Sequence, residues 1–194
     1  MKPHDLKSLS ITTFPAGQML ARIQRRHATD GSSRVNGLFL PPIDDQPKGR
    51  FDLAHKPSCY LAETAETAVY EALARREASH LALATLKDRE LVTVKTLRAL
   101  AVADLRPHAR PYPVLQSLRY AETQELALSI HNQGCDGILY RSAQQAGADC
   151  WVLFGDAIRA CKVTRRALLA EPVTGGLHRV IVEALHGSRI PLVP

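Results

Sequence analysis

The sequence predicts a single α+β domain, with a mixed or largely antiparallel sheet and flanking helices. The expected elements follow the order strands, helix, strands, helix, strands, which is not the regular alternation of a parallel α/β sheet. Neither G-x-G-x-x-G nor G-x-x-x-x-G-K-[ST] occurs, so no nucleotide site of the Rossmann or P-loop kind is expected. The length of 194 residues fits one domain better than two.

The first half of the chain is expected to contain short strands and one helix. Strands are predicted over residues 18–23, 37–40 and 58–62, and the Asp, Pro and Gly residues of 44–49 mark a loop. Thr64 is the predicted N-cap of the helix. The helix has one apolar stripe at the spacing i, i+3, i+4, i+7, i+8, made of Ala65, Ala68, Val69, Ala72 and Leu73.

The second half is expected to contain further strands, two helices and a loose end. Strands are predicted over residues 80–85, 91–97, 100–105, 137–140, 150–154 and 157–163. Helices are predicted over 121–132, ended by Gly134, and over 180–185. Prolines mark 106–113 as a loop, and residues 191–194 are expected to fray.

Composition argues against several classes of protein. The net charge is +6 without a run of five like charges, which disfavours a nucleic-acid tail and suits a small anionic ligand. The four cysteines show no C-x-x-C spacing and the histidines are scattered, so no metal site is expected. No signal peptide and no membrane span are recognised, so we expect a cytoplasmic protein with reduced, buried thiols.

Five segments of the sequence indicate more than secondary structure. They are Phe14-Pro-Ala-Gly followed by Met-Leu-Ala-Arg22, Gly49-Arg-Phe-Asp52, the stretch from Tyr60-Leu-Ala to Glu71, Asp136-Gly-Ile-Leu-Tyr-Arg-Ser142, and Cys150-Trp-Val-Leu-Phe154. In this order and at these spacings they resemble the RES-domain family, which is named for its arginine, glutamate and serine. The resemblance covers residues 14–165.

The resemblance implies a fold, an activity and a partner. The fold would be similar to that of ADP-ribosyltransferases, with residues 1–194 as a single RES domain, a core at 14–165 and a C-terminal extension at 170–194. The activity would be cleavage of NAD at the nicotinamide–ribose bond, with NAD as substrate and no cofactor. Members are commonly toxins that an Xre-type antitoxin blocks at the active site. A dimer within such a complex is left open.

Charged residues of these motifs suit the chemistry of NAD. Arg22 and Arg50 are the candidates to pair with its pyrophosphate, because guanidinium groups bind phosphate bidentately. Glu71 is the candidate to stabilise the oxocarbenium ion that forms on the ribose when nicotinamide leaves. From periodicity alone, Glu71 would instead be a solvated helix glutamate paired with Arg75.

Uncharged candidates complete the predicted site. We expect Ser142 to hydrogen-bond the nicotinamide amide or the ribose, and not to act as a nucleophile, because no base is indicated near it. Tyr60 is expected to stack on the nicotinamide ring, and Tyr140, which shares a strand face with Ser142, is a weaker candidate. The structural alternatives are a serine bonded to backbone and a tyrosine packed in the core.

Three readings of the function remain open. The first is an NAD glycohydrolase or phosphorylase, for which Arg25 or Arg34 would supply the cation that phosphate needs. The second is transfer of ADP-ribose to a protein, with the same residues and another acceptor. The third is a non-enzymatic binding module, for example for nucleic acid, which the lack of a basic helical stripe disfavours.

Overall fold

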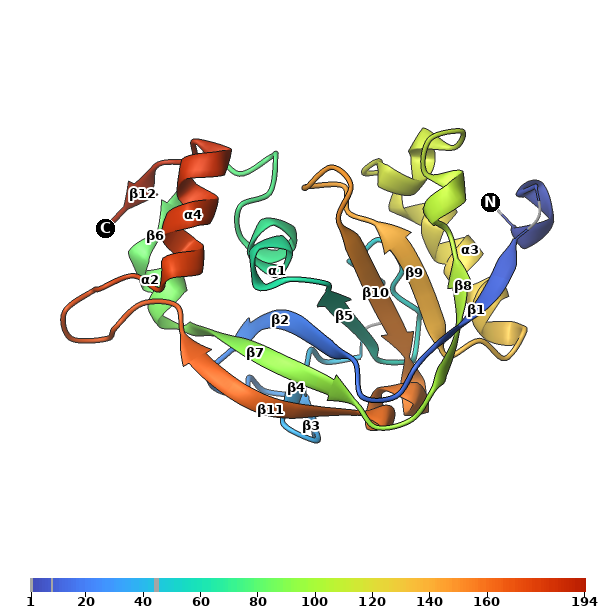
Figure 1. The fold of residues 1–194 in the computed structure, drawn as a ribbon, viewed down its shortest axis with the longest axis horizontal. Coiled ribbons are helices and arrows are strands. Elements are labelled where there is room, and N and C mark those ends of the chain that lie inside the picture. The colour runs from blue at the N-terminus through green and yellow to red at the C-terminus, as the bar shows by residue number, and fades with distance from the viewer. Residues whose placement is uncertain (1, 8, 44–45) are drawn as a thin grey trace.

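The computed structural model describes residues 2–7, 9–43 and 46–194, and its centre is a mixed sheet of eight strands (Figure 1). These strands are β1 (Ser10–Phe14), β2 (Met19–Arg25), β5 (Ser58–Ala62), β7 (Arg89–Thr96), β8 (Leu100–Asp104), β9 (Gly137–Arg141), β10 (Asp149–Phe154) and β11 (Cys161–Leu168). Their order is β1-β8-β9-β10-β5-β2-β7-β11. The β8–β9 pair is parallel and the other pairs are antiparallel, which confirms the predicted α+β class with a mixed sheet.

Helices cover the sheet at its middle and at both ends (Figure 1). They are α1 (Ala65–Ala72), α2 (Leu83–Lys87), α3 (Tyr120–Asn132) and α4 (Arg179–Ser188), with short 3-10 turns at Pro3–Asp5, Arg106–His108, Pro113–Gln116 and Gly155–Ala160. Helix α1 packs on β2 and α4, whereas α3 packs on β9. Two small sheets join β3 (Ser33–Val35) to β4 (Leu38–Leu40), and β6 (Leu81–Ala82) to β12 (Leu192–Val193).

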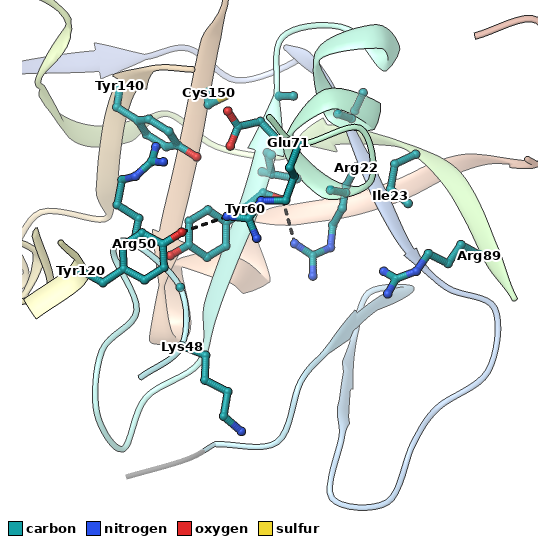
Figure 2. A pocket seen from close by; sticks show the side chains of 17 residues that line it. Arg22, Ile23, Lys48, Arg50, Tyr60, Glu71, Arg89, Tyr120, Tyr140 and Cys150 are labelled. Atoms are coloured by element: carbon teal, nitrogen blue, oxygen red, sulfur yellow. Dashed lines mark hydrogen bonds between the residues drawn. The ribbon is translucent and has the colours of Figure 1, made fainter. Parts of the chain in front are cut away.

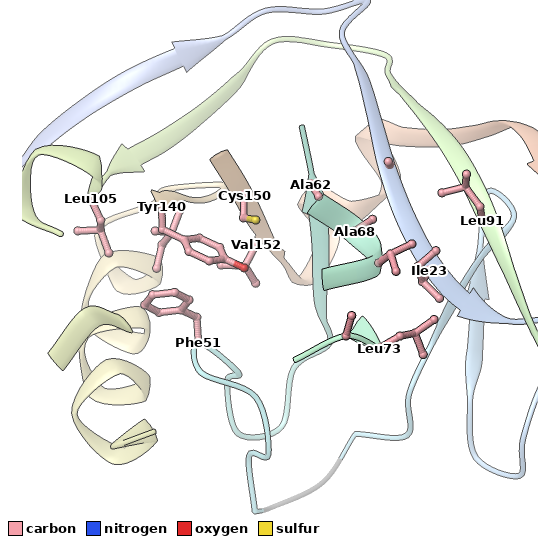
Figure 3. Packing of buried hydrophobic residues seen from close by; sticks show 14 of the residues in the cluster. Ile23, Phe51, Ala62, Ala68, Leu73, Leu91, Leu105, Tyr140, Cys150 and Val152 are labelled. Carbon is pink, nitrogen blue, oxygen red and sulfur yellow. The ribbon is translucent and has the colours of Figure 1, made fainter. Parts of the chain in front are cut away.

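The sheet separates two apolar layers. The larger layer joins Ile23 and Leu91 of one half of the sheet to Tyr140 and Val152 of the other, with Ala68 of α1 between them (Figure 3). The smaller layer lies on the opposite face and includes Trp151, Leu153, Val92 and Val94. Each large apolar side chain buried in this way stabilises the fold by roughly 1.5–3 kcal/mol, so both faces of the central strands are fixed by packing.

The two halves of the sheet meet at a narrow junction. Strands β2 and β5 share one registered pair, Ala21 with Ala62, after which they part. The Arg22 side chain spans the opening, because its Nη1 donates to the backbone oxygen of Tyr60 at 2.8 Å. A side chain thus satisfies a carbonyl group that a neighbouring strand would otherwise satisfy.

Local signals account for the predicted helices. The Thr64 Oγ1 accepts from the backbone nitrogen of Thr67 at 3.1 Å, which confirms the predicted N-cap of α1. Helix α3 matches the prediction over 121–132, with Leu126 and Ile130 fully buried. Gly134 follows its end at a φ of +84°, the left-handed conformation that favours glycine after a helix. Helix α4 is longer than the predicted 180–185.

Several boundaries predicted from the sequence are wrong. Strand β1 was not predicted, because it is an edge strand whose Ile11 faces solvent and breaks the apolar pattern. The strand predicted over 80–85 is the two-residue β6 followed by α2, since Leu and Ala also favour helix. The strand predicted over 157–163 is a 3-10 turn up to Ala160, and β11 begins only at Cys161.

Two further expectations concern loops and the chain end. Residues 191–194 were expected to fray, yet Leu192 and Val193 form β12 and pair with β6 in parallel, a long-range contact that local composition does not reveal. Of the loop predicted over 44–49, residues 44 and 45 lie outside the described part. No helix among the described residues is long and apolar enough to span a membrane.

Asp136 connects the start of β9 to the start of β8 and to Arg98 just before it. Its carboxylate accepts from both Nη atoms of Arg98, at 2.7 and 2.9 Å, and from the backbone nitrogen of Ala101 at 2.9 Å. The hydrogen bonds from Arg98 are the main cause that lowers the pKa of Asp136. The aspartate of the D-G-I motif therefore has a structural role.

We expect Asp136→Asn to destabilise the protein at pH 7 by about 1–2 kcal/mol. Because the folded-state pKa of Asp136 is lowered, its contribution is present above the unfolded pKa of about 3.9 and is lost as the pH falls through the folded value. Thermal unfolding at pH 7 and pH 3 should show that the difference in melting temperature between wild type and variant is smaller at pH 3. A difference of constant size would contradict the role of the ionised carboxylate.

We expect Gly137→Ala to destabilise the protein by roughly 3 kcal/mol through steric overlap. A Cβ atom at Gly137 would lie 2.1 Å from the backbone oxygen of Val152 and 2.9 Å from Leu153, so β9 and β10 would have to separate. The matched control is Gly134→Ala, where a Cβ meets nothing within 4 Å and only the left-handed backbone is strained, at a cost of about 1 kcal/mol. Urea unfolding gives the free energy of unfolding of both variants. Equal losses of stability in Gly137→Ala and Gly134→Ala would refute the packing argument.

Candidate active site

A cavity of about 300 Å³ opens where β2 and β5 part, below α1 (Figure 2). Its lining comes from β2, the loop before β5, β5, α1, and single residues of more distant elements: Ala21, Arg22, Ile23, Lys48, Gly49, Arg50, Tyr60, Leu61, Ala62, Ala68, Glu71, Ala72, Arg75, Arg89, Tyr120, Tyr140 and Cys150. This volume lies at the small end of the range for ligand sites.

The structure brings the residues predicted from the sequence together. Arg22, Arg50, Tyr60, Glu71 and Tyr140 all line this cavity, although they come from five separate segments of the chain. Ser142 lies directly behind it: the serine is 1% exposed and its hydroxyl contacts Glu71. A ligand in the cavity therefore meets Glu71 first.

Glu71 is held by uncharged donors. Its Oε1 accepts from the Ser142 Oγ at 2.5 Å and from the backbone nitrogen of Ala143 at 3.1 Å. The Ser142 Oγ itself accepts from the backbone nitrogens of Gln144 and Gln145, at 3.1 and 2.9 Å. The turn after β9 thus fixes the serine, and the serine fixes the carboxylate.

The pairing of Glu71 with Arg75, which helix periodicity alone suggested, is not found. Arg75 instead lies 2.9 Å from the carboxylate of Glu77 and donates from Nη2 to the Tyr120 hydroxyl, also at 2.9 Å. A tertiary contact with Tyr120 and an ion pair with Glu77 have replaced the helix pair, and the Glu71 side chain lines the cavity (Figure 2).

Arg50 is presented by a turn that several groups hold. The Asp52 carboxylate accepts from the backbone nitrogen of Gly49 at 2.6 Å, and the Tyr60 hydroxyl accepts from that of Phe51 at 2.8 Å. From α3, Thr123 donates to the backbone oxygen of Arg50 at 2.5 Å. A Cβ at Gly49 would lie 2.6 Å from both Asp52 and Tyr60, which explains the glycine of the G-R-F motif.

The guanidinium of Arg50 retains free hydrogen-bonding capacity. The residue is 7% exposed, and its Nε is buried without a partner among the described residues. The guanidinium carbon lies 6.0 Å from the centre of the Tyr120 ring. A buried, unsatisfied cationic donor at a cavity wall is suited to an anionic ligand.

Arg22 has a structural role beside its place in the lining. One Nη atom donates to Tyr60 and the other to the backbone oxygen of Phe39 at 3.4 Å, while the buried Nε has no partner within the described ranges. Its charge is therefore fixed at the mouth of the sheet junction. Arg25 and Arg34, considered as further cations, do not line this cavity.

Two buried tyrosines of the cavity, Tyr60 and Tyr140, and its cysteine are neutral. Burial raises the pKa of Tyr60 and of Tyr140 well above the ordinary value, with further contributions from Asp52 and from Cys150, respectively. Burial, reinforced by Glu71, also raises the pKa of Cys150, so its thiol is not a ready nucleophile. The two phenols thus offer rings and neutral hydroxyl groups.

Other cavity residues were missed at the sequence level. Lys48, Arg75, Arg89 and Tyr120 complete the lining, and Glu71 is the one carboxylate among the described residues that form it. Lys48 adjoins the recognised G-R-F motif, but Arg89 carries no local signal, because only strand pairing brings it to the site. No cluster of potential metal ligands is found in the described ranges.

Comparisons with known proteins agree with this architecture. A family model described as the RES domain matches residues 19–172. Among solved structures, the M. tuberculosis MbcT–MbcA toxin–antitoxin complex contains a chain that matches with a TM-score of 0.58 and 21% sequence identity, over 80% of this chain and 85% of that one. At this identity the likeness shows a shared fold. A comparison with curated proteins finds no matching sequence.

We expect Ser142→Ala and Glu71→Gln to be coupled in stability. Removing the serine hydroxyl takes away one of the two hydrogen bonds of Glu71 and leaves the backbone nitrogens of Gln144 and Gln145 without this partner, at a cost of about 1–3 kcal/mol. In a double-mutant cycle, the coupling energy should exceed about 0.5 kcal/mol. Ser117→Ala, combined with Glu71→Gln in a second cycle, is the control. The Ser117 hydroxyl makes comparable hydrogen bonds to the backbone of its own turn, and no carboxylate is found bonded to it among the described residues. Additive losses of Ser142→Ala and Glu71→Gln would contradict the contact.

Proposed function

Because the chain belongs to the RES-domain family, we propose that it cleaves NAD between nicotinamide and ribose and acts as a toxin that an antitoxin neutralises. The observation that carries the proposal is the charge pattern of the cavity. One carboxylate, Glu71, lies among cationic residues in its described lining, and it is held by Ser142 and Ala143 without an ion pair. This pattern suits a substrate that has a pyrophosphate and a ribose that becomes cationic during the reaction.

Glu71 would act on the sugar. When the glycosidic bond breaks, its electron pair goes to the nicotinamide nitrogen, which loses its positive charge, and the ribose becomes an oxocarbenium ion. The hydrogen bonds found among the described residues use Oε1 of Glu71, so Oε2 is the oxygen to face this cation or a ribose hydroxyl. An acceptor then adds to the anomeric carbon and loses its proton.

Ser142 would act through Glu71. We expected it to contact the ligand, but its burial and its bond to Oε1 favour a positioning role. Arg50, buried and with a free Nε, is suited to bind the pyrophosphate. The neutral rings of Tyr60 and Tyr140 line the same cavity and would pack against the nicotinamide.

The acceptor determines which reaction the site performs. Water gives a glycohydrolase and phosphate a phosphorylase, and the same site would serve transfer of ADP-ribose to a protein. The fold match to a chain of a toxin–antitoxin complex supports an antitoxin partner. We propose an Xre-type antitoxin that covers the cavity, an association that could include a dimer. NAD would be the substrate, without a cofactor, in the cytoplasm.

We expect purified protein to deplete NAD and release nicotinamide, and Glu71→Gln to lower the rate at least about 100-fold. Arg50→Met should raise KM more than it lowers kcat, because its charge would bind substrate and transition state alike. The matched control is Glu66→Gln, on the same helix but outside the cavity lining, which should leave the rate unchanged.

Reactions with and without phosphate identify the acceptor from the product. A folded Glu71→Gln variant with the wild-type rate would refute the assigned role of this residue. Release of nicotinamide only when a second protein is present would favour the transferase.

A further inference from the structure

We propose that a second cavity beside the first binds the far nucleoside half of a dinucleotide, with Arg89 as the anion-binding residue between them; this rests on the proposed function. The second cavity has a volume of about 200 Å³ and lies between β2, residues 27–32 and the end of β4. Arg22, Ile23 and Arg89 line both cavities, which makes the two spaces neighbours.

Strand alternation places the shared residues at the boundary. Arg22 and Gln24 point to the same face of β2, where Arg22 reaches Phe39 and Gln24 donates to the backbone oxygen of Gly37 at 3.2 Å. This is the face that carries the β3–β4 hairpin. Since β2 and β5 part at this point, Arg22 also lines the first cavity and lies between the two.

Arg89 lies beside two other arginines and is suited to bind an anion. It begins β7 opposite Arg25, and burial first and the charge of Arg25 next lower the pKa of its guanidinium, with Arg22 adding to this and the neighbouring Asp88 opposing it only in part. Its buried Nε has no partner in the described part of the chain. Two other arginines of the sheet are paired with carboxylates, Arg166 with Glu90 and Arg141 with Asp149.

The walls of the second cavity suit a nucleoside. Ile23, Leu40 and Pro41 provide apolar surface for a base, and Thr29 and Ser32 provide hydroxyl groups at the rim. Glu71 and Arg50 line only the first cavity. A ligand that occupies both spaces would thus have its reacting ribose at Glu71, the phosphate next to that ribose at Arg50 and Arg22, the other phosphate at Arg89, and a second base beyond them.

This arrangement predicts selectivity by ligand length. Nicotinamide mononucleotide would occupy the first cavity alone, whereas NAD would use both. Arg89 would therefore contribute to the recognition of the dinucleotide and not to the chemistry at the ribose.

We expect Arg89→Met to raise KM for NAD roughly tenfold with kcat for NAD unchanged, and to raise KM for nicotinamide mononucleotide much less. The matched control is Arg26→Met, since Arg26 lies just past β2 and lines neither cavity. An equal loss for both substrates, or no loss for NAD, would overturn the proposal.

A binding measurement separates this inference from the proposed reaction. By calorimetry, wild type and Arg26→Met should bind ADP-ribose equally, and Arg89→Met about tenfold more weakly. This readout needs no turnover, so it holds even if wild type cleaves neither substrate, in which case only the proposed reaction fails. Failure of wild type to bind ADP-ribose, or equal binding by Arg89→Met, would refute the second cavity as a nucleoside site.

Discussion

The parting of β2 and β5 is the constraint on which the rest of this structure depends. One backbone pair, Ala21 with Ala62, joins the two halves of the sheet, and beyond it the strands need other partners for their polar groups. Arg22 supplies one by donating to Tyr60. Because α1 follows β5 directly from its cap at Thr64, Glu71 lies over this opening, and the cavity forms between them.

Motif residues divide into those that shape the backbone and those that present charge. Gly49 and Gly137 are needed because neighbouring atoms occupy the space of a Cβ, and Asp136 holds the start of β9 through Arg98. Arg50 and Glu71 then project into the cavity that these contacts define. A family pattern of this kind therefore records packing as much as chemistry, so a motif residue cannot be assigned a catalytic role from its presence alone.

Local patterns were sufficient for the central strands and for α1 and α3, because their apolar periodicity matches the face they bury. They failed where distant contacts decide, as for β12 on β6. The β3–β4 hairpin had a usable signal, Asn36-Gly37 with both φ angles positive, which is typical of a two-residue turn. Arg89 had none, because its place depends on its register opposite Arg25 across 64 residues of chain.

The uncharged setting of Glu71 is what makes the cationic cavity compatible with the proposed reaction. An ion pair with Arg75 would cancel the field of the carboxylate where the ribose must become positive. Arg75 instead contacts Glu77 and Tyr120, whereas Glu71 accepts hydrogen bonds from Ser142 and Ala143. The surrounding guanidinium groups can then attract the phosphates of a ligand while the carboxylate keeps its charge for the sugar.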